Sequence, residues 1–160
     1  MWPQLNDGNW PCTCTNEAFD PAAVASIMPQ LETYWVSLNG PTTTFLGHEW
    51  TKHGTCAEDV YPTQLEYFSG VLSLLSKFNA TVGLAAAGIV PSNTKAVPLS
   101  AFKDAITKYS NGTVAVTCDS SGYVTGLIQC ITKGGASMNC PANVPDDCSS
   151  KNVYLLASGK

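Results

Sequence analysis

The stretch HEWTKHGTC, residues 48–56, places two imidazoles, a carboxylate and an ammonium within six consecutive positions. Only 12% of the 160 residues are charged, so this concentration of polar chemistry stands apart from the rest of the chain. On a helix that advances about 100° per residue, Glu49, Lys52, His53 and Cys56 share one face. If a disulfide draws Cys56 toward the core, the same face lies against the protein. The three polar side chains are then expected to line the floor of a cleft.

These groups suit the cleavage of RNA by its own 2′-hydroxyl. That reaction removes a proton from the hydroxyl, stabilises extra negative charge on phosphorus and protonates the leaving 5′-oxygen. An imidazole exchanges protons in either direction near its unperturbed pKa of about 6.5. Lys52 offers positive charge to phosphate oxygens, and Glu49 can hold a neighbouring group in place or share a proton. The reaction needs no metal ion.

The stretch is also compatible with two other interpretations. His-Glu also begins the zinc-binding helix motif of metalloproteases, in which the second histidine follows four residues after the first. Here His53 follows His48 after five residues, so on a regular helix the two side chains point about 140° apart and are not expected to grip one ion. In the simpler alternative, both histidines are surface or capped core residues beside a solvated pair formed by Glu49 and Lys52.

The spacing of apolar residues predicts helices first and strands later. Residues 1–19 are expected to form a loop, after which Asp20 and Pro21 start a helical run to about Leu38 that Pro29 kinks or breaks. Further helices are predicted over about 44–56, 63–78, 82–87 and 100–109. A hairpin is predicted between residues 113 and 131, followed by a last short strand over 153–156. This order favours one α+β domain spanning residues 1–160.

Helical spacing also predicts which residues of the helix over 63–78 face the core. Its start carries a capping-box pattern of Thr63 and Glu66. Trp50, one position from the polar stripe, is expected to be core rather than ligand. The inward face of the helix over 63–78 is expected to consist of Leu65, Phe68, Val71, Leu72, Leu75 and Phe78.

Composition bounds the setting in which the protein works. The formal net charge is −4, so the surface as a whole lacks the basic footprint of general nucleic-acid binding, and RNA would need a local site. Seven cysteines indicate disulfides, and the triplets Asn79-Ala80-Thr81 and Asn111-Gly112-Thr113 are compatible with glycosylation in the secretory route. No apolar run is long enough to cross a membrane and none at the start resembles a signal peptide, so a soluble mature protein or fragment is expected.

Residues 48–56 closely resemble the second conserved active-site segment of the ribonuclease T2 family. Trp2-Pro3 is similar to the end of the first such segment in that family. The resemblance extends over nearly the whole chain, through Phe19-Asp20-Pro21, Tyr34-Trp35, Cys130, Cys140-Pro141 and Cys148.

The resemblance implies a role for each residue of the site. His53 would act as catalytic acid or base, Glu49 and Lys52 would stabilise the pentacoordinate phosphorus, His48 would contact phosphate and Trp2 would bind a base. A simpler alternative makes Trp2 an aromatic cover for apolar surface near a terminus.

The family's fold and activity are implied in the same way. The fold would be α+β, with several helices packed against a central antiparallel sheet and with stapling disulfides. The activity would be cleavage of single-stranded RNA, with little base preference, through 2′,3′-cyclic phosphate ends and without a metal or other cofactor. The protein would not act on DNA or bind membranes, would be a monomer, and would be secreted or vacuolar or lysosomal.

The family's cysteine pattern implies three disulfides. The expected pairs are Cys14 with Cys56, Cys118 with Cys148, and Cys130 with Cys140. Cys12 is then the odd cysteine, and its expected partner is a residue upstream of this chain.

The chain departs from the family at its first position. The family's first segment carries a catalytic histidine three residues before the tryptophan that matches Trp2, whereas this chain starts at Met1 and has no histidines besides His48 and His53. We therefore expect an N-terminally truncated domain whose activity is slowed by roughly 10²- to 10⁴-fold. One alternative is a catalytically inactive member that serves in RNA binding, storage or protein interaction. Another is a disulfide-rich structural glycoprotein without a phosphate site.

Overall fold

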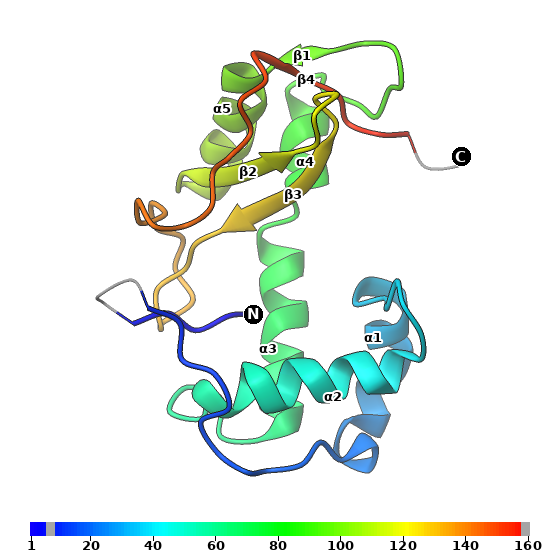
Figure 1. Ribbon diagram of the computed structural model, residues 1–160, viewed down its shortest axis with the longest axis vertical. Coiled ribbons are helices and arrows are strands. Elements are labelled where there is room, and N and C mark those ends of the chain that lie inside the picture. Colours follow the sequence, from blue (N-terminus) through cyan, green and yellow to red (C-terminus); the bar gives the residue numbers. More distant parts are fainter. Residues whose placement is uncertain (6–8, 158–160) are drawn as a thin grey trace. The chain divides into compact units, whose positions relative to one another are not determined.

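The computed structural model describes residues 1–5 and 9–157, which divide into two compact units between Lys77 and Phe78. The first unit is helical, and Figure 1 shows its elements in blue to green. They are the 3₁₀ helix η1 (Pro21–Ile27), α1 (Met28–Tyr34), α2 (Thr42–Lys52), the 3₁₀ turn η2 (Gly54–Cys56) and α3 (Gln64–Lys77).

The second unit combines helices with antiparallel strands (Figure 1). Its elements are α4 (Ala80–Ala86), β1 (Val97–Pro98), α5 (Leu99–Ser110), β2 (Val114–Cys118), β3 (Val124–Gln129) and β4 (Asn152–Val153). The α+β class is confirmed. Within the described ranges, the strands form two separate two-stranded sheets, β1 with β4 and β2 with β3, where one central sheet was expected.

The predicted start of the first helical run at Asp20 and Pro21 is confirmed, but the run changes its helix type and ends earlier than predicted. The Asp20 carboxylate accepts a hydrogen bond from the Ala22 N–H at 2.9 Å and so caps η1. Pro29 lies in the first turn of α1, where its missing N–H costs nothing, and the run changes there from 3₁₀ to α geometry. The helix ends at Tyr34, before Leu38, because the backbone of Trp35 leaves the helical region.

An aromatic core holds the first unit together. Trp50 of α2 is fully buried, as predicted, and its ring lies edge-on to that of Tyr67 of α3, with 5.7 Å between the ring centroids. The predicted inward face of α3 is wrong at two positions, since Leu65 is 39% exposed and Leu75 is 43% exposed. Leu65 lies about 200° around the helix from Tyr67, and Leu75 lies beyond the core beside a surface pocket. The remaining core residues are Val24, Leu31, Leu46, Ala57 and Phe68.

The second unit is built around the predicted hairpin. Strand β2 pairs with β3 in antiparallel register, with Val114 opposite Gln129, and a bulge follows Thr117. The carboxylate of Asp119 organises the turn by accepting hydrogen bonds from two backbone N–H groups. Helix α5 packs on β2. The core residues of this unit are Leu84, Ile89, Phe102, Ile106, Val114, Val116, Cys148 and Val153.

The structure contains the three expected disulfides. Their Cα–Cα distances are 5.0 Å for Cys14–Cys56, 4.7 Å for Cys118–Cys148 and 5.1 Å for Cys130–Cys140. Cys12 is exposed and forms no disulfide within the described residues. None of the helices described here is both long and apolar enough to cross a membrane.

Asp146 ties the loop before Cys148 to two other elements. Its carboxylate accepts hydrogen bonds from the Lys103 ammonium of α5 at 2.6 Å and from the Val116 N–H of β2 at 2.9 Å. Partial burial disfavours the charged carboxylate, but the hydrogen bonds and the charge of Lys103 outweigh that effect and hold the pKa of Asp146 below its ordinary value. Asp146 is therefore a stabilising anion.

This arrangement predicts a pH-dependent contribution to stability. Because the folded pKa of Asp146 is depressed, its contribution is fully present above the pKa of the unfolded chain and is lost as the pH falls through the folded value. Replacing Asp146→Asn should lower the free energy of unfolding at pH 7 by about 1 kcal/mol, a modest loss because the pair with Lys103 is partly exposed. At pH 3 the loss should be smaller, because part of the wild-type carboxylate is then protonated. Urea unfolding at both pH values measures this. Asp147→Asn, which removes the same charge one residue along, should change neither value appreciably, and equal losses in both variants would contradict the assignment.

Candidate active site

Helix α2 and the residue after it carry the polar groups predicted to act together. Glu49 is buried, with 6% of its surface exposed, whereas His48 and Lys52 are exposed and His53 is half-buried. A buried carboxylate, a half-buried imidazole and an exposed ammonium therefore lie at one end of the helix. Cations at the C-terminal end of a helix are favoured by the partial negative charge of its free carbonyls.

The helix predicted over about 44–56 is wrong at its end, because α2 stops at Lys52 and the 3₁₀ turn η2 covers Gly54–Cys56. The last helical residue is Lys52, and His53 has φ −121° and ψ −44°, outside regular helical geometry. The expectation that the imidazoles of His48 and His53 diverge is therefore wrong, because it assumed a regular helix through both. Their ring centroids lie 6.4 Å apart.

The N-terminal loop fastens the end of α2. The Thr13 N–H donates to the Lys52 carbonyl at 3.1 Å, and the Cys14 N–H donates to the Thr55 hydroxyl at 3.1 Å. The Cys14–Cys56 disulfide closes the same junction. These contacts satisfy a carbonyl that the helix end leaves free, and they hold the backbone on both sides of His53.

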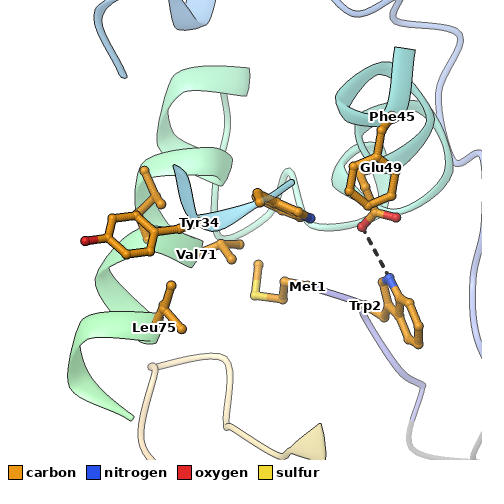
Figure 2. A pocket seen from close by; sticks show the side chains of 9 residues that line it. Met1, Trp2, Tyr34, Phe45, Glu49, Val71 and Leu75 are labelled. Carbon is orange, nitrogen blue, oxygen red and sulfur yellow. Dashed lines mark hydrogen bonds between the residues drawn. The ribbon is translucent and has the colours of Figure 1, made fainter. Parts of the chain in front are cut away.

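Trp2, in the N-terminal loop, contacts both Glu49 and His53. Its indole N–H donates to the Glu49 carboxylate at 3.3 Å, drawn as the dashed line in Figure 2. Its ring also lies against the imidazole of His53, with 5.3 Å between centroids and a tilt of 33°. More than half of the Trp2 surface stays exposed.

A shallow apolar pocket adjoins Trp2 and Glu49. Its volume is about 370 Å³, and the side chains of Met1, Tyr34 and Leu75 surround it in Figure 2. Glu49 supplies the carboxylate at one side of this otherwise apolar lining.

The surroundings of His53 shift its proton affinity. Burial lowers the pKa of His53 below 6.5, and the Glu49 carboxylate opposes that shift by favouring the charged imidazolium. The positive charges of Lys52 and His48 act in the same direction as burial. The imidazole therefore releases its proton at a lower pH than a free histidine does.

One set of side chains in the described part of the chain could hold a metal ion. Donor atoms of His48, Glu49 and His53 lie within 4.8 Å of one another. We assign no ion to them, because a carboxylate and imidazoles are also the groups that transfer protons without a metal. Lys52 contributes its charge nearby, through its effect on the pKa of His53.

Residues 1–140 match the sequence profile of the Ribonuclease T2 family. The chain belongs to the ribonuclease T2 family. It is similar to Ribonuclease DdI of Dictyostelium discoideum, with 35% identity over 143 residues that cover 88% of this chain and 64% of that protein. It is 31% identical to Extracellular ribonuclease LE of Solanum lycopersicum over 150 residues, which cover 88% of this chain and 65% of that protein.

A solved ribonuclease has the same fold. The structure of RNase NT in complex with 5′-AMP superposes with a TM-score of 0.87 at 26% identity, over 97% of this chain and 79% of that one. The fold is thus ribonuclease T2-like. The chain spans slightly under two thirds of the length of the two curated ribonucleases compared above.

Three contributors to the site were not predicted from the sequence. Thr13 and Thr55 fasten the end of α2, and Tyr67 holds the loop that carries Trp2 through a hydrogen bond to the Met1 carbonyl. Tyr67 lies on the apolar side of α3, so its helical position could have indicated burial. Nothing in the sequence relates its hydroxyl to a residue 66 positions away.

Gly54 should be indispensable to the turn after His53. A Cβ at this position would overlap the ring of the buried Trp50. Gly54→Ala should therefore lower the free energy of unfolding by about 1–3 kcal/mol through overpacking. In Gly47→Ala, the added Cβ makes only ordinary contact with Phe19, and stability should stay the same or rise by up to about 1 kcal/mol. Urea unfolding of both variants tests this, and equal stabilities would contradict it.

The electrostatic balance at His53 predicts the effect of neutralising Glu49. In Glu49→Gln the carboxylate no longer favours the imidazolium, so the pKa of His53 should fall further below its wild-type value. Titration of the imidazole signals by NMR measures it, and His48→Gln assigns the two histidines. Replacement of the distant Glu32→Gln is the matched control and should leave the titration unchanged. A rise in the pKa of His53 in Glu49→Gln would contradict the assignment.

Proposed function

We propose that this chain is an endoribonuclease that cleaves single-stranded RNA by transphosphorylation, through a 2′,3′-cyclic phosphate and without a metal ion. The observation that carries the proposal is the meeting of Glu49, His53 and Lys52 at one end of α2 in a chain of the ribonuclease T2 family. The likeness to RNase NT, solved in complex with 5′-AMP, supports a nucleotide as ligand.

His53 is the proposed proton-transfer group. It is half-buried, and its lowered pKa lets it exchange a proton in mildly acidic solution. Glu49 favours the protonated imidazole, so a proton taken up by His53 is stabilised until it is passed to the leaving 5′-oxygen. Burial of Glu49 strengthens this interaction because less water screens it.

Lys52 and His48 are the proposed phosphate contacts. Both are exposed and neighbour His53, so a phosphodiester can approach them while its 2′-hydroxyl or 5′-oxygen faces the imidazole. The Lys52 ammonium would offset the charge that develops on phosphorus, and Glu49 would assist through the proton of His53. The positive charge of Lys52 would attract an anionic ligand locally, although the net charge of the protein is −4.

Trp2 is the proposed base contact. Stacking of a base on an exposed aromatic ring is worth about 1–3 kcal/mol and tolerates any base, which fits a nuclease of low base preference. The reaction consumes the 2′-hydroxyl of the substrate, and DNA has no such group. RNA is therefore the substrate and DNA is not.

A catalytically inactive RNA-binding, storage or interaction protein is the second candidate. It is favoured by the histidine content of the chain, since His48 and His53 are its two histidines and both belong to this one site. Transphosphorylation uses one group to accept a proton and another to donate one. We propose that the 160-residue chain alone cleaves RNA roughly 10²- to 10⁴-fold more slowly than a family member with a complete histidine pair.

We propose that the protein is secreted or resides in a vacuole or lysosome. Its three disulfides support this location, because such bonds persist in oxidising compartments. The likeness to a ribonuclease named as extracellular supports it further.

Cleavage of single-stranded RNA at about pH 5 tests the proposed activity. His53→Ala should lower the rate about 10²- to 10⁴-fold because a positioned proton-transfer group is lost. Lys52→Ala should lower it about tenfold or more, whereas the matched surface change Lys151→Ala should leave it unchanged. The wild-type rate should be the same with and without a chelator.

Binding of 5′-AMP, measured by calorimetry, separates the candidates. A wild-type chain that binds 5′-AMP and cleaves no RNA indicates the inactive RNA-binding protein. A chain that neither binds nor cleaves contradicts the nuclease and the RNA-binding protein, and leaves the storage or interaction protein as the remaining candidate. Equal cleavage by wild type and His53→Ala would reject the assigned role of His53.

A further inference from the structure

The loop that carries Trp2 has little structure of its own. Residues 1–5 belong to no helix or strand. No regular secondary structure fixes the Trp2 indole beside Glu49 and His53. Its position depends on its own side-chain contacts and on the contacts of the neighbouring backbone. The backbone contact nearest to Trp2 within this segment is made by the Met1 carbonyl.

Tyr67 makes that contact from the core. Its hydroxyl donates to the Met1 carbonyl at 2.8 Å, across 66 positions of sequence. Burial raises the pKa of the Tyr67 hydroxyl, and the nearby Glu49 carboxylate raises it further, so the group stays protonated and remains a donor.

The ring of Tyr67 is itself held rigidly. It is fully buried and contacts the rings of Trp35, Trp50, Tyr61 and Phe68, with centroid distances of 5.1–6.5 Å. Four ring contacts hold the Tyr67 ring in the core, so its hydroxyl oxygen is held beside its acceptor. Its acceptor, the carbonyl of Met1, adjoins the residue whose indole binds Glu49 and lies against His53.

We propose that Tyr67 is a positioning residue of the site, whose hydroxyl anchors the backbone at Met1 and thereby keeps the Trp2 indole on Glu49 and His53. Its bearing on catalysis rests on the proposed nuclease function. Tyr67 is given no direct contact with His53 or with the proposed phosphate contacts, Lys52 and His48. Its effect passes through Trp2. Because Trp2 contacts both Glu49 and His53, the binding of a base to Trp2 would be coupled to the orientation of these two side chains.

A purely structural role for Tyr67 makes a different prediction. If Tyr67 only fills the core, Tyr67→Phe, which keeps the ring and removes the hydroxyl, should leave the surroundings of Trp2 unchanged. If the hydroxyl anchors Met1, the same change frees the loop and alters the environment of the Trp2 indole.

The indole N–H signals in a ¹H–¹⁵N NMR spectrum distinguish these outcomes without any need for activity. The chain has four tryptophans, and Trp2→Phe identifies the signal of Trp2. In Tyr67→Phe we expect this signal to shift and to exchange faster with solvent. The matched control is Tyr61→Phe, which removes a hydroxyl from the same aromatic cluster and should leave the Trp2 signal in place. An unchanged Trp2 signal in Tyr67→Phe overturns the proposal.

The wild-type spectrum provides a test that does not depend on how well a variant folds. A Tyr67 hydroxyl proton that is protected from exchange and lies close to the Met1 backbone supports the proposal. A hydroxyl proton that exchanges freely with solvent overturns it.

A double-mutant cycle tests the route through Trp2. Tyr67→Phe alone should lower kcat/KM for RNA roughly two- to tenfold, the effect of one hydrogen bond. In the Trp2→Phe background, which already lacks the indole donor to Glu49, the further loss should be less than twofold. The same loss in both backgrounds overturns the route through Trp2. If wild type cleaves no RNA, the nuclease function fails, and the NMR measurements still decide whether Tyr67 positions Trp2.

Discussion

The junction after helix α2 is the constraint on which the site depends. The helix stops at Lys52, and His53 leaves the helical path immediately afterwards. Three contacts hold this geometry: the Cys14–Cys56 disulfide and the hydrogen bonds from Thr13 and Cys14. The proton transfer proposed for His53 needs a fixed side-chain position, and a helix end is otherwise the part of a helix that frays most readily. The covalent link and the loop contacts supply that fixed position.

The buried Glu49 carboxylate organises the electrostatics around this junction. An acid removed from water needs hydrogen bonds or positive charge nearby, and it receives the Trp2 indole N–H and the neighbouring cations. In return it opposes the loss of a proton from His53, and it adds to the burial that raises the pKa of the Tyr67 hydroxyl. One buried charge therefore links the proton-transfer group, the exposed aromatic ring and the core beneath them.

Much of the fold and the site could be predicted from local patterns. The cap at Asp20, the burial of Trp50 and the hairpin of β2 and β3 follow from short-range residue chemistry and period. The motif at residues 48–56 indicated the family, and the resemblance to that family implied the three disulfide pairs. The face of α3 was harder, because helical period alone does not say which of several apolar stripes another element covers. Leu65 and Leu75 were assigned inward on that basis and are exposed.

The sequence by itself determined which residues are the candidates for the chemistry, residues 48–56, that they begin on a helix, and that the chain is an α+β protein of the ribonuclease T2 family. It did so because helix period, caps, turns and motif spacings act between residues near one another in the chain. Only the tertiary structure decided that His48 and His53 approach each other, that Trp2 donates to Glu49, and that Tyr67 holds Met1. These contacts join residues far apart in the chain or depend on where a helix ends, and packing, not local propensity, determines both.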